Sequence, residues 1–165
     1  MNMHSISISS NSFENRQPIP IKHACDGQDI SPHISWENGP QGTKSFIILA
    51  YDKDIPFKGL SLFTWIHWLV YNIPPDISEL EEGFPNNKVF ENGIKQGITT
   101  FKKPGYGGPC PPFGIHRYFF KVFALDKKID LGPEATTWKK IKKEIKGHIL
   151  ADGEMFGVYS RKIKP

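Results

Sequence analysis

The chain has 165 residues, of which 38% are hydrophobic and 13% aromatic, so we expect one domain, residues 1–165, with a core that needs no disulfide. The formal net charge of +4 is too small an excess for a dedicated nucleic-acid-binding protein. The longest apolar run, residues 46–51, is too short to span a bilayer, and residues 1–12 lack the pattern of a signal peptide. These features predict a cytoplasmic protein with no integral membrane association.

Three segments have the composition of well-defined β-strands. Residues 45–51 form a continuous apolar run, which is typical of a strand buried on both faces. Residues 65–73 and 116–125 are rich in aromatic and β-branched side chains. Weaker strand signals lie at residues 5–9, 34–36 and 156–161.

One helix is predicted over residues 134–147. Trp138, Ile141, Ile145 and Ile149 fall on one apolar stripe, and the lysines of this segment occupy the opposite, solvated face. The whole pattern predicts a mostly antiparallel β domain with one or two short helices late in the chain.

The two cysteines, Cys25 and Cys110, are expected as reduced thiols in the cytoplasm. A bridge between them would close about 85 residues and stabilise the fold by about 4 kcal/mol in the chain-entropy model. The sequence alone leaves open whether they meet.

A loop rich in glycine and proline precedes the last predicted strand. Eight of the eleven residues from Pro104 to Gly114 are Gly or Pro, which fits neither a helix nor a central strand. We expect a rigid loop with free backbone N–H groups near Gly107 and Gly108, followed at once by His116 and Tyr118. Free amides beside donor side chains predict an anion site.

Strand alternation sorts the remaining candidates. Trp65 and His67 share one strand face, and Asp52 and Asp54 flank a lysine after the buried strand. Each also has an ordinary structural explanation: a core histidine, a pair of turn-forming aspartates, or a structural ion pair between Asp54 and Arg117.

Two catalytic alternatives are less favoured. Cys110 with His116 as base would suit a cysteine-dependent hydrolase, although prolines flank this cysteine. Two carboxylates and two imidazoles, at Asp52, Asp54, His67 and His116, would suit a metal-dependent hydrolase, but they lack the short spacing of strong metal motifs.

Three blocks of the sequence resemble the phosphatidylethanolamine-binding protein family, also called Raf kinase inhibitor proteins. They are Asp-Lys-Asp-Ile-Pro at residues 52–56, Trp-Ile-His-Trp-Leu-Val-Tyr-Asn-Ile-Pro at residues 65–74, and the Tyr-Gly-Gly-Pro-Cys-Pro-Pro to Gly-Ile-His-Arg-Tyr block at residues 106–118. The chain stops four residues after Arg161, so it resembles the short prokaryotic type.

The resemblance implies a large antiparallel sheet packed on a smaller one, and a pocket for phosphate-like groups, including phospholipid headgroups. The implied pocket residues are Asp52, Trp65, His67, Gly108, Cys110, Pro111, His116 and Tyr118, with Asp54 and Arg117 close behind. Since no group in this set is placed to attack a ligand, we expect a non-enzymatic binding protein with no cofactor or metal. The alternative is an inhibitor or scaffold that acts through its surface on a kinase or serine protease; a homodimer is also left open.

Overall fold

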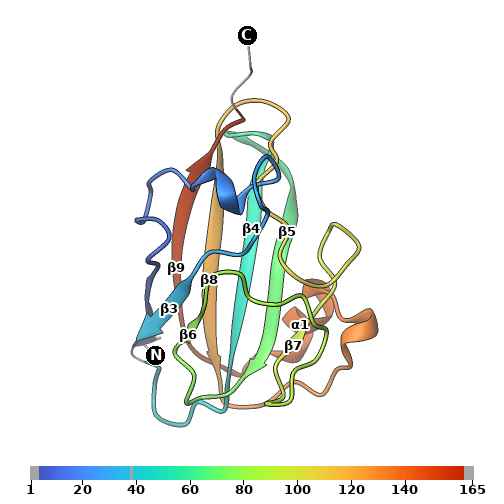
Figure 1. Cartoon of the computed structure of the whole chain (residues 1–165). Coiled ribbons are helices and arrows are strands. Elements are labelled where there is room, and N and C mark those ends of the chain that lie inside the picture. Colours follow the sequence, from blue (N-terminus) through green and yellow to red (C-terminus); the bar gives the residue numbers. More distant parts are fainter. Residues whose placement is uncertain (1–3, 38, 162–165) are drawn as a thin grey trace.

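The computed structural model describes residues 4–37 and 39–161 and contains two β-sheets (Figure 1). The large sheet has the strand order β1-β9-β8-β4-β5-β7, and the small sheet has the order β2-β3-β6. The strands are β1 (His4–Ser5), β2 (Ser7–Ser9), β3 (Ile34–Glu37), β4 (Ser45–Phe57), β5 (Leu60–Ile73), β6 (Glu79–Leu80), β7 (Lys95–Gln96), β8 (His116–Leu125) and β9 (Ile149–Tyr159). This confirms the predicted mainly-β fold of two sheets, with one difference: β1 pairs with β9 in parallel, so the large sheet is mixed.

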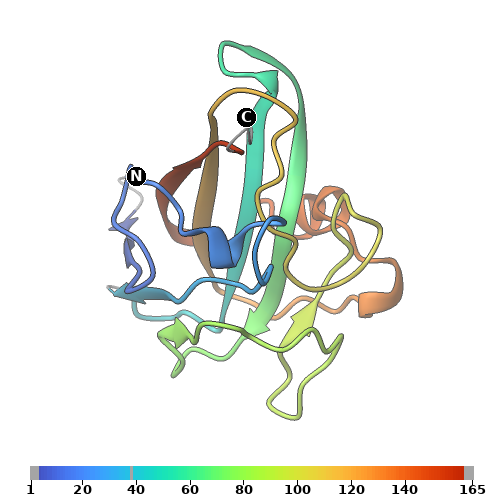
Figure 2. The ribbon, with the colours of Figure 1, turned by 45° about the horizontal axis from the view of Figure 1, so that its top comes forward.

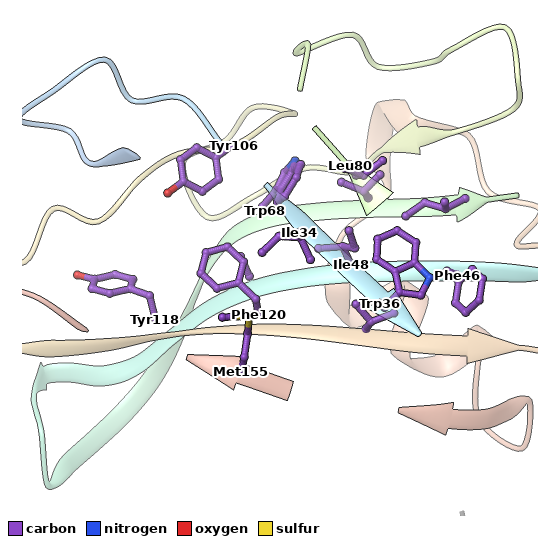
Figure 3. Packing of buried hydrophobic residues seen from close by; sticks show 14 of the residues in the cluster. Ile34, Trp36, Phe46, Ile48, Trp68, Leu80, Tyr106, Tyr118, Phe120 and Met155 are labelled. Carbon is purple, nitrogen blue, oxygen red and sulfur yellow. The ribbon is translucent and has the colours of Figure 1, made fainter. Parts of the chain in front are cut away.

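The strand β4 is buried on both faces, as its apolar run predicted. Ile48 and Ala50 pack in the core between the two sheets, whereas Ile47 and Leu49 pack in a second cluster on the opposite face. Figure 3 shows the first core, where side chains of the large sheet meet Trp36 from β3. A strand that separates two cores fixes the register of its neighbours, because a slip by one residue would move every side chain to the wrong face.

The second cluster is covered by α1 (Trp138–Glu144), which is shorter than the helix predicted over residues 134–147. The segment begins with a separate 3-10 turn, Pro133–Ala135, and the extended backbone of Thr136 and Thr137 interrupts it. The apolar stripe is correct for Ile141 and Ile145, which are buried, but Ile149 belongs to β9 and not to the helix. In the described residues, no helix combines the length and apolar character needed to cross a bilayer.

The β4–β5 hairpin extends past the rest of the sheet (Figure 2). The sequence predicted strand ends at Tyr51 and Trp65, but the two strands keep pairing as far as Phe57 and Leu60. This added length builds one side of the cavity described next.

Candidate functional site

A cavity of about 320 Å³ lies at the base of the β4–β5 extension. Its walls come from β4, β5, β8, the loop that precedes β8, and the segment around Phe101. The lining residues are Asp52, Ile55, Pro56, Phe63, Trp65, His67, Phe101, Cys110, Pro111, Pro112, His116 and Tyr118. All the predicted pocket residues except Gly108 are therefore brought to one place.

The sheet register explains why these residues meet. Asp52 on β4 pairs with Trp65 on β5 and with Tyr118 on β8, so one row crosses three neighbouring strands. His67 and His116 lie two residues from this row, on the same faces as Trp65 and Tyr118. Both imidazoles contact the Tyr118 ring, with ring centroids 5.2 and 6.3 Å from it.

His116 is held by a buried carboxylate. Its Nδ1 lies 2.6 Å from Asp52 Oδ2, and the other oxygen, Oδ1, accepts from the backbone N–H of Asp54 at 2.7 Å. An ionised carboxylate only accepts hydrogen bonds, so Nδ1 carries the hydrogen. The opposite nitrogen, Nε2, is buried and has no hydrogen-bond partner among the described residues.

His67 has the same arrangement with a different acceptor. Its Nδ1 donates to the carbonyl oxygen of Gly107 at 2.6 Å. Burial lowers the pKa of His67, which keeps this ring neutral. Histidine N–H groups directed at a ligand were expected, but the Nδ1 hydrogen of each ring is used on the protein.

The expectation of free loop amides is wrong. The N–H of Gly107 donates to the carbonyl of His67 at 2.9 Å, and the N–H of Gly108 donates to Asp29 Oδ1 at 2.7 Å. Gly108 serves packing instead, because an added Cβ would lie 2.1 Å from the carbonyl oxygen of His23. Nothing local in the sequence indicates that a distant aspartate would take this amide.

The expectation of reduced thiols is also wrong, because the structure joins Cys25 and Cys110 in a disulfide with Cα atoms 5.5 Å apart. The glycine- and proline-rich loop lies against the segment that contains Cys25. The backbone N–H of Cys25 donates to the carbonyl of Pro109 at 3.0 Å. The hydroxyl of Tyr106 donates to the backbone carbonyl of His23 at 2.7 Å. These contacts bring the two thiols together and fix one wall of the pocket.

Asp54 and Arg117 form a structural pair next to the pocket, as one reading of the sequence suggested. Asp54 Oδ2 accepts from the backbone N–H and Nε of Arg117, both at 2.9 Å, and Oδ1 accepts from the guanidinium at 2.8 Å. Burial opposes ionisation of Asp54, but the hydrogen bonds from Arg117 outweigh it and lower its pKa. Neither residue lines the cavity.

Trp65 provides a second unsatisfied polar group. Its indole Nε1 is buried and, within the described part of the chain, has no hydrogen-bond partner. The ring packs edge-on against Phe101, with centroids 5.4 Å apart. Three lining residues were not predicted. Ile55 and Phe63 were missed because the strands were predicted to end earlier, and Phe101 lies in a loop with little regular pattern.

The four side chains considered as metal ligands do not gather around one point. Within residues 4–37 and 39–161 no three His, Cys, Asp or Glu side chains are grouped so as to hold a metal ion. Both oxygens of Asp54 accept hydrogen bonds from Arg117.

Comparisons with known proteins agree with this fold. Residues 9–160 match the sequence model of the family described as phosphatidylethanolamine-binding protein. A relative from Aquifex aeolicus, named UPF0098 protein, is 49% identical over 158 residues, which cover 93% of this chain and 88% of the relative. Another UPF0098 protein, from Methanothermobacter thermautotrophicus, is 38% identical and covers 94% of this chain and 99% of its own.

Solved structures show the same architecture. A phosphatidylethanolamine-binding protein homologue from Chlamydia trachomatis has a TM-score of 0.84 at 35% identity, covering 96% of this chain and 99% of its own. YbcL from E. coli has a TM-score of 0.83 at 30% identity, and the match covers 96% of this chain and 100% of YbcL. A carboxypeptidase Y inhibitor, solved with its cognate proteinase, shares the fold at 18% identity with a TM-score of 0.54. The match covers 95% of this chain and 83% of the inhibitor. The chain therefore belongs to the phosphatidylethanolamine-binding protein family and is of its prokaryotic type.

Proposed function

We propose that this chain is a non-enzymatic binding protein whose pocket takes a small anion, either phosphate or a phosphorylated headgroup. The observation that carries the proposal is the pair of buried nitrogens, His116 Nε2 and Trp65 Nε1, that lack partners among the described residues. Buried polar groups are nearly always satisfied. His23 Nε2 and Trp36 Nε1 also lack partners in the described part of the chain, but only Trp65 and His116 line one cavity together, and this coincidence supports a ligand there.

The chemistry of the pocket suits an anionic oxygen. The Trp65 indole is a donor only, and protonated His116 would donate from Nε2 while Asp52 stabilises its positive charge. Apolar side chains, including Ile55 and Phe63, form much of the lining, and an apolar environment strengthens hydrogen bonds.

The proposal includes binding without turnover. Cys110, the candidate nucleophile, is held in the disulfide with Cys25, so a cysteine-dependent hydrolase would first need a reductant. No proposed step uses a cofactor or a metal ion.

Replacing His116 with alanine tests the pocket. We expect His116→Ala to weaken inorganic phosphate binding at least about tenfold, or ~1.4 kcal/mol, because a charge-assisted hydrogen bond is lost. Isothermal titration calorimetry measures this directly. The matched control is His148→Ala, since His148 also pairs with a carboxylate, that of Asp126 at 2.7 Å, but does not line the pocket. Equal phosphate affinity in His116→Ala and the unaltered chain would refute the assignment.

A second candidate function is inhibition or scaffolding through the surface, acting on a serine protease or a kinase. It is favoured by the exposed apolar side chains of Phe57 and Phe113, whose ring centroids lie 6.4 Å apart. These two residues directly follow the pocket residues Pro56 and Pro112 in the chain. Leu62 on the same hairpin is 65% exposed. Exposed apolar groups that gather in this way mark interaction surfaces. Protease inhibition that survives loss of both pocket histidines but not Leu62→Glu would support this function.

The expected cytoplasmic location stays a prediction, and the disulfide is the observation that bears on it. Cytosolic thiols are mostly kept reduced, although intracellular proteins of hyperthermophiles are often disulfide-rich. Trapping of free thiols in intact cells would show whether Cys25 and Cys110 are joined there.

A further inference from the structure

We infer that the pocket binds its anion only together with a proton, which lies between His116 Nε2 and an oxygen of the ligand. This inference rests on the proposed anion pocket and specifies which anions it accepts. A ligand either brings an acidic hydroxyl hydrogen or takes up a proton from solvent through His116.

The argument starts from the two oxygens of Asp52. Oδ1 is committed to the backbone N–H of Asp54 at 2.7 Å, and Oδ2 is committed to His116 Nδ1 at 2.6 Å. The hydrogen of a neutral His116 ring therefore lies on Nδ1. Nε2 then carries a bare lone pair with no partner among the described residues, on a ring that lines the cavity. A ligand oxygen also presents lone pairs, so the two atoms repel unless a proton lies between them.

His67 cannot replace His116 as the donor. Its hydrogen is likewise committed to Nδ1, which donates to the Gly107 carbonyl at 2.6 Å, and burial lowers the pKa of this ring. When both rings are neutral, the Trp65 indole is the pocket nitrogen that still donates. The neutral pocket therefore offers the Trp65 indole and the Tyr118 hydroxyl as donors, and two imidazole acceptors, beside the negative charge of Asp52.

The charged groups around His116 single out Asp52 as the partner of a protonated ring. The titratable groups that face His116 are Asp52 and Asp54 on β4, His67 on β5, Arg117 and Tyr118 on β8, and Tyr159 on β9. Asp54 is neutralised by Arg117, and Asp26, which accepts from Tyr159, is neutralised by Arg161. Among the described residues, no lysine or arginine forms an ion pair with Asp52, so its charge is available to an imidazolium.

This arrangement separates classes of phosphate ligand. Near pH 8 inorganic phosphate still carries one P–OH hydrogen, which Nε2 of the neutral ring accepts. A phosphodiester such as dimethyl phosphate, which models the diester of a phospholipid headgroup and has no O–H or N–H group, carries none, so its complex must take a proton from solvent. Free phosphate and a lipid headgroup therefore share the phosphoryl oxygen but differ in proton uptake.

Calorimetry in two buffers of different ionisation enthalpy counts the protons taken up. At about pH 8 we expect dimethyl phosphate to bind with uptake of about one proton per site, and inorganic phosphate to bind with almost none. As the pH rises through the range where the free His116 ring is neutral, the affinity for the diester should fall about tenfold per pH unit. Diester binding without proton uptake, at an affinity independent of pH, would overturn the proton claim alone. Failure of both probes to bind at any pH would overturn the anion pocket itself.

Asp52→Asn provides the sharper variant. The backbone N–H of Asp54 holds the side-chain oxygen of the new asparagine, so its amide donates to His116 Nδ1 and moves the ring hydrogen to Nε2. We expect this variant to bind the diester at pH 8 without proton uptake and at least as tightly as the unaltered chain. The control Asp126→Asn alters the equivalent His148 pair outside the pocket and should leave proton uptake unchanged.

A second variant covers the case in which Asp52→Asn does not fold. His116→Gln presents an amide N–H that does not titrate, so diester binding should again lose its proton uptake. Persistence of about one proton of uptake in whichever variant folds would contradict the assignment of that proton to His116.

Discussion

At His116 the position of one hydrogen atom decides what the pocket can bind. Asp52 and Asp126 each accept from the Nδ1 of a histidine, at 2.6 and 2.7 Å, yet only the first pair is buried. The His148 side chain is 42% exposed, so water can satisfy its remaining nitrogen. Burial is what turns the same pair of residues into a site with an unmet hydrogen-bonding group.

Gly108 makes a residue-level prediction about the loop that forms the pocket wall. Gly108→Ala would place a Cβ 2.1 Å from the backbone oxygen of His23, so the loop must move. We expect a loss of about 1–3 kcal/mol in the free energy of unfolding, measured by urea denaturation.

The control for this substitution is Gly132→Ala. An added Cβ there meets nothing within 4 Å, and its backbone has no positive φ. Equal stability of Gly108→Ala and Gly132→Ala would show that the close approach at Gly108 is unimportant.

The residue types of the site could be predicted from the sequence, but their hydrogen bonds could not. Strand alternation placed Trp65 with His67, and His116 with Tyr118, and the structure brings both pairs into one cavity. The sequence carries no signal that Asp29, far from Gly108 along the chain, would occupy its amide.

At the level of elements, the central strands were predicted well and their ends were not. The continuous apolar pattern of β4 and the aromatic pattern of β8 reflect burial, which composition reveals. Beyond Tyr51 the chain continues with Lys53, Asp54 and Pro56, which are typical of a turn. Pairing with β5 and the ion pair with Arg117 keep this polar segment extended.

The disulfide yields the prediction at this scale. Reduction, or the Cys25→Ser and Cys110→Ser double substitution, releases a closed loop spanning 85 residues. We expect the free energy of unfolding to fall by about 4 kcal/mol in the chain-entropy model, measured by chemical denaturation with and without reductant.

If the double serine variant had the same free energy of unfolding as the oxidised chain, this account of the loop would be contradicted. The oxidised chain without substitutions, tested in the same reductant-free buffer, is the reference. A thiol count with and without denaturant confirms the redox state of each sample.

Across the whole molecule, two buried histidines make stability depend on pH. Burial lowers the pKa of both His23 and His67 in the folded chain, whereas an unfolded histidine titrates near about 6.5. The unfolded state therefore takes up protons first as the pH falls, and the folded state loses stability below about pH 6.5. Urea denaturation should give a lower free energy of unfolding at about pH 5.5 than at about pH 7.5. Equal or greater stability at the lower pH would show that these two rings are not kept neutral by burial.

The two-sheet architecture places the pocket where three strands of the large sheet, a disulfide-tied loop and a hairpin extension meet. The most direct test is a crystal structure of the unaltered chain soaked in inorganic phosphate. The account predicts one phosphate within hydrogen-bond distance of both His116 Nε2 and Trp65 Nε1. An empty pocket at saturating phosphate, or phosphate bound only at other positions, would contradict it.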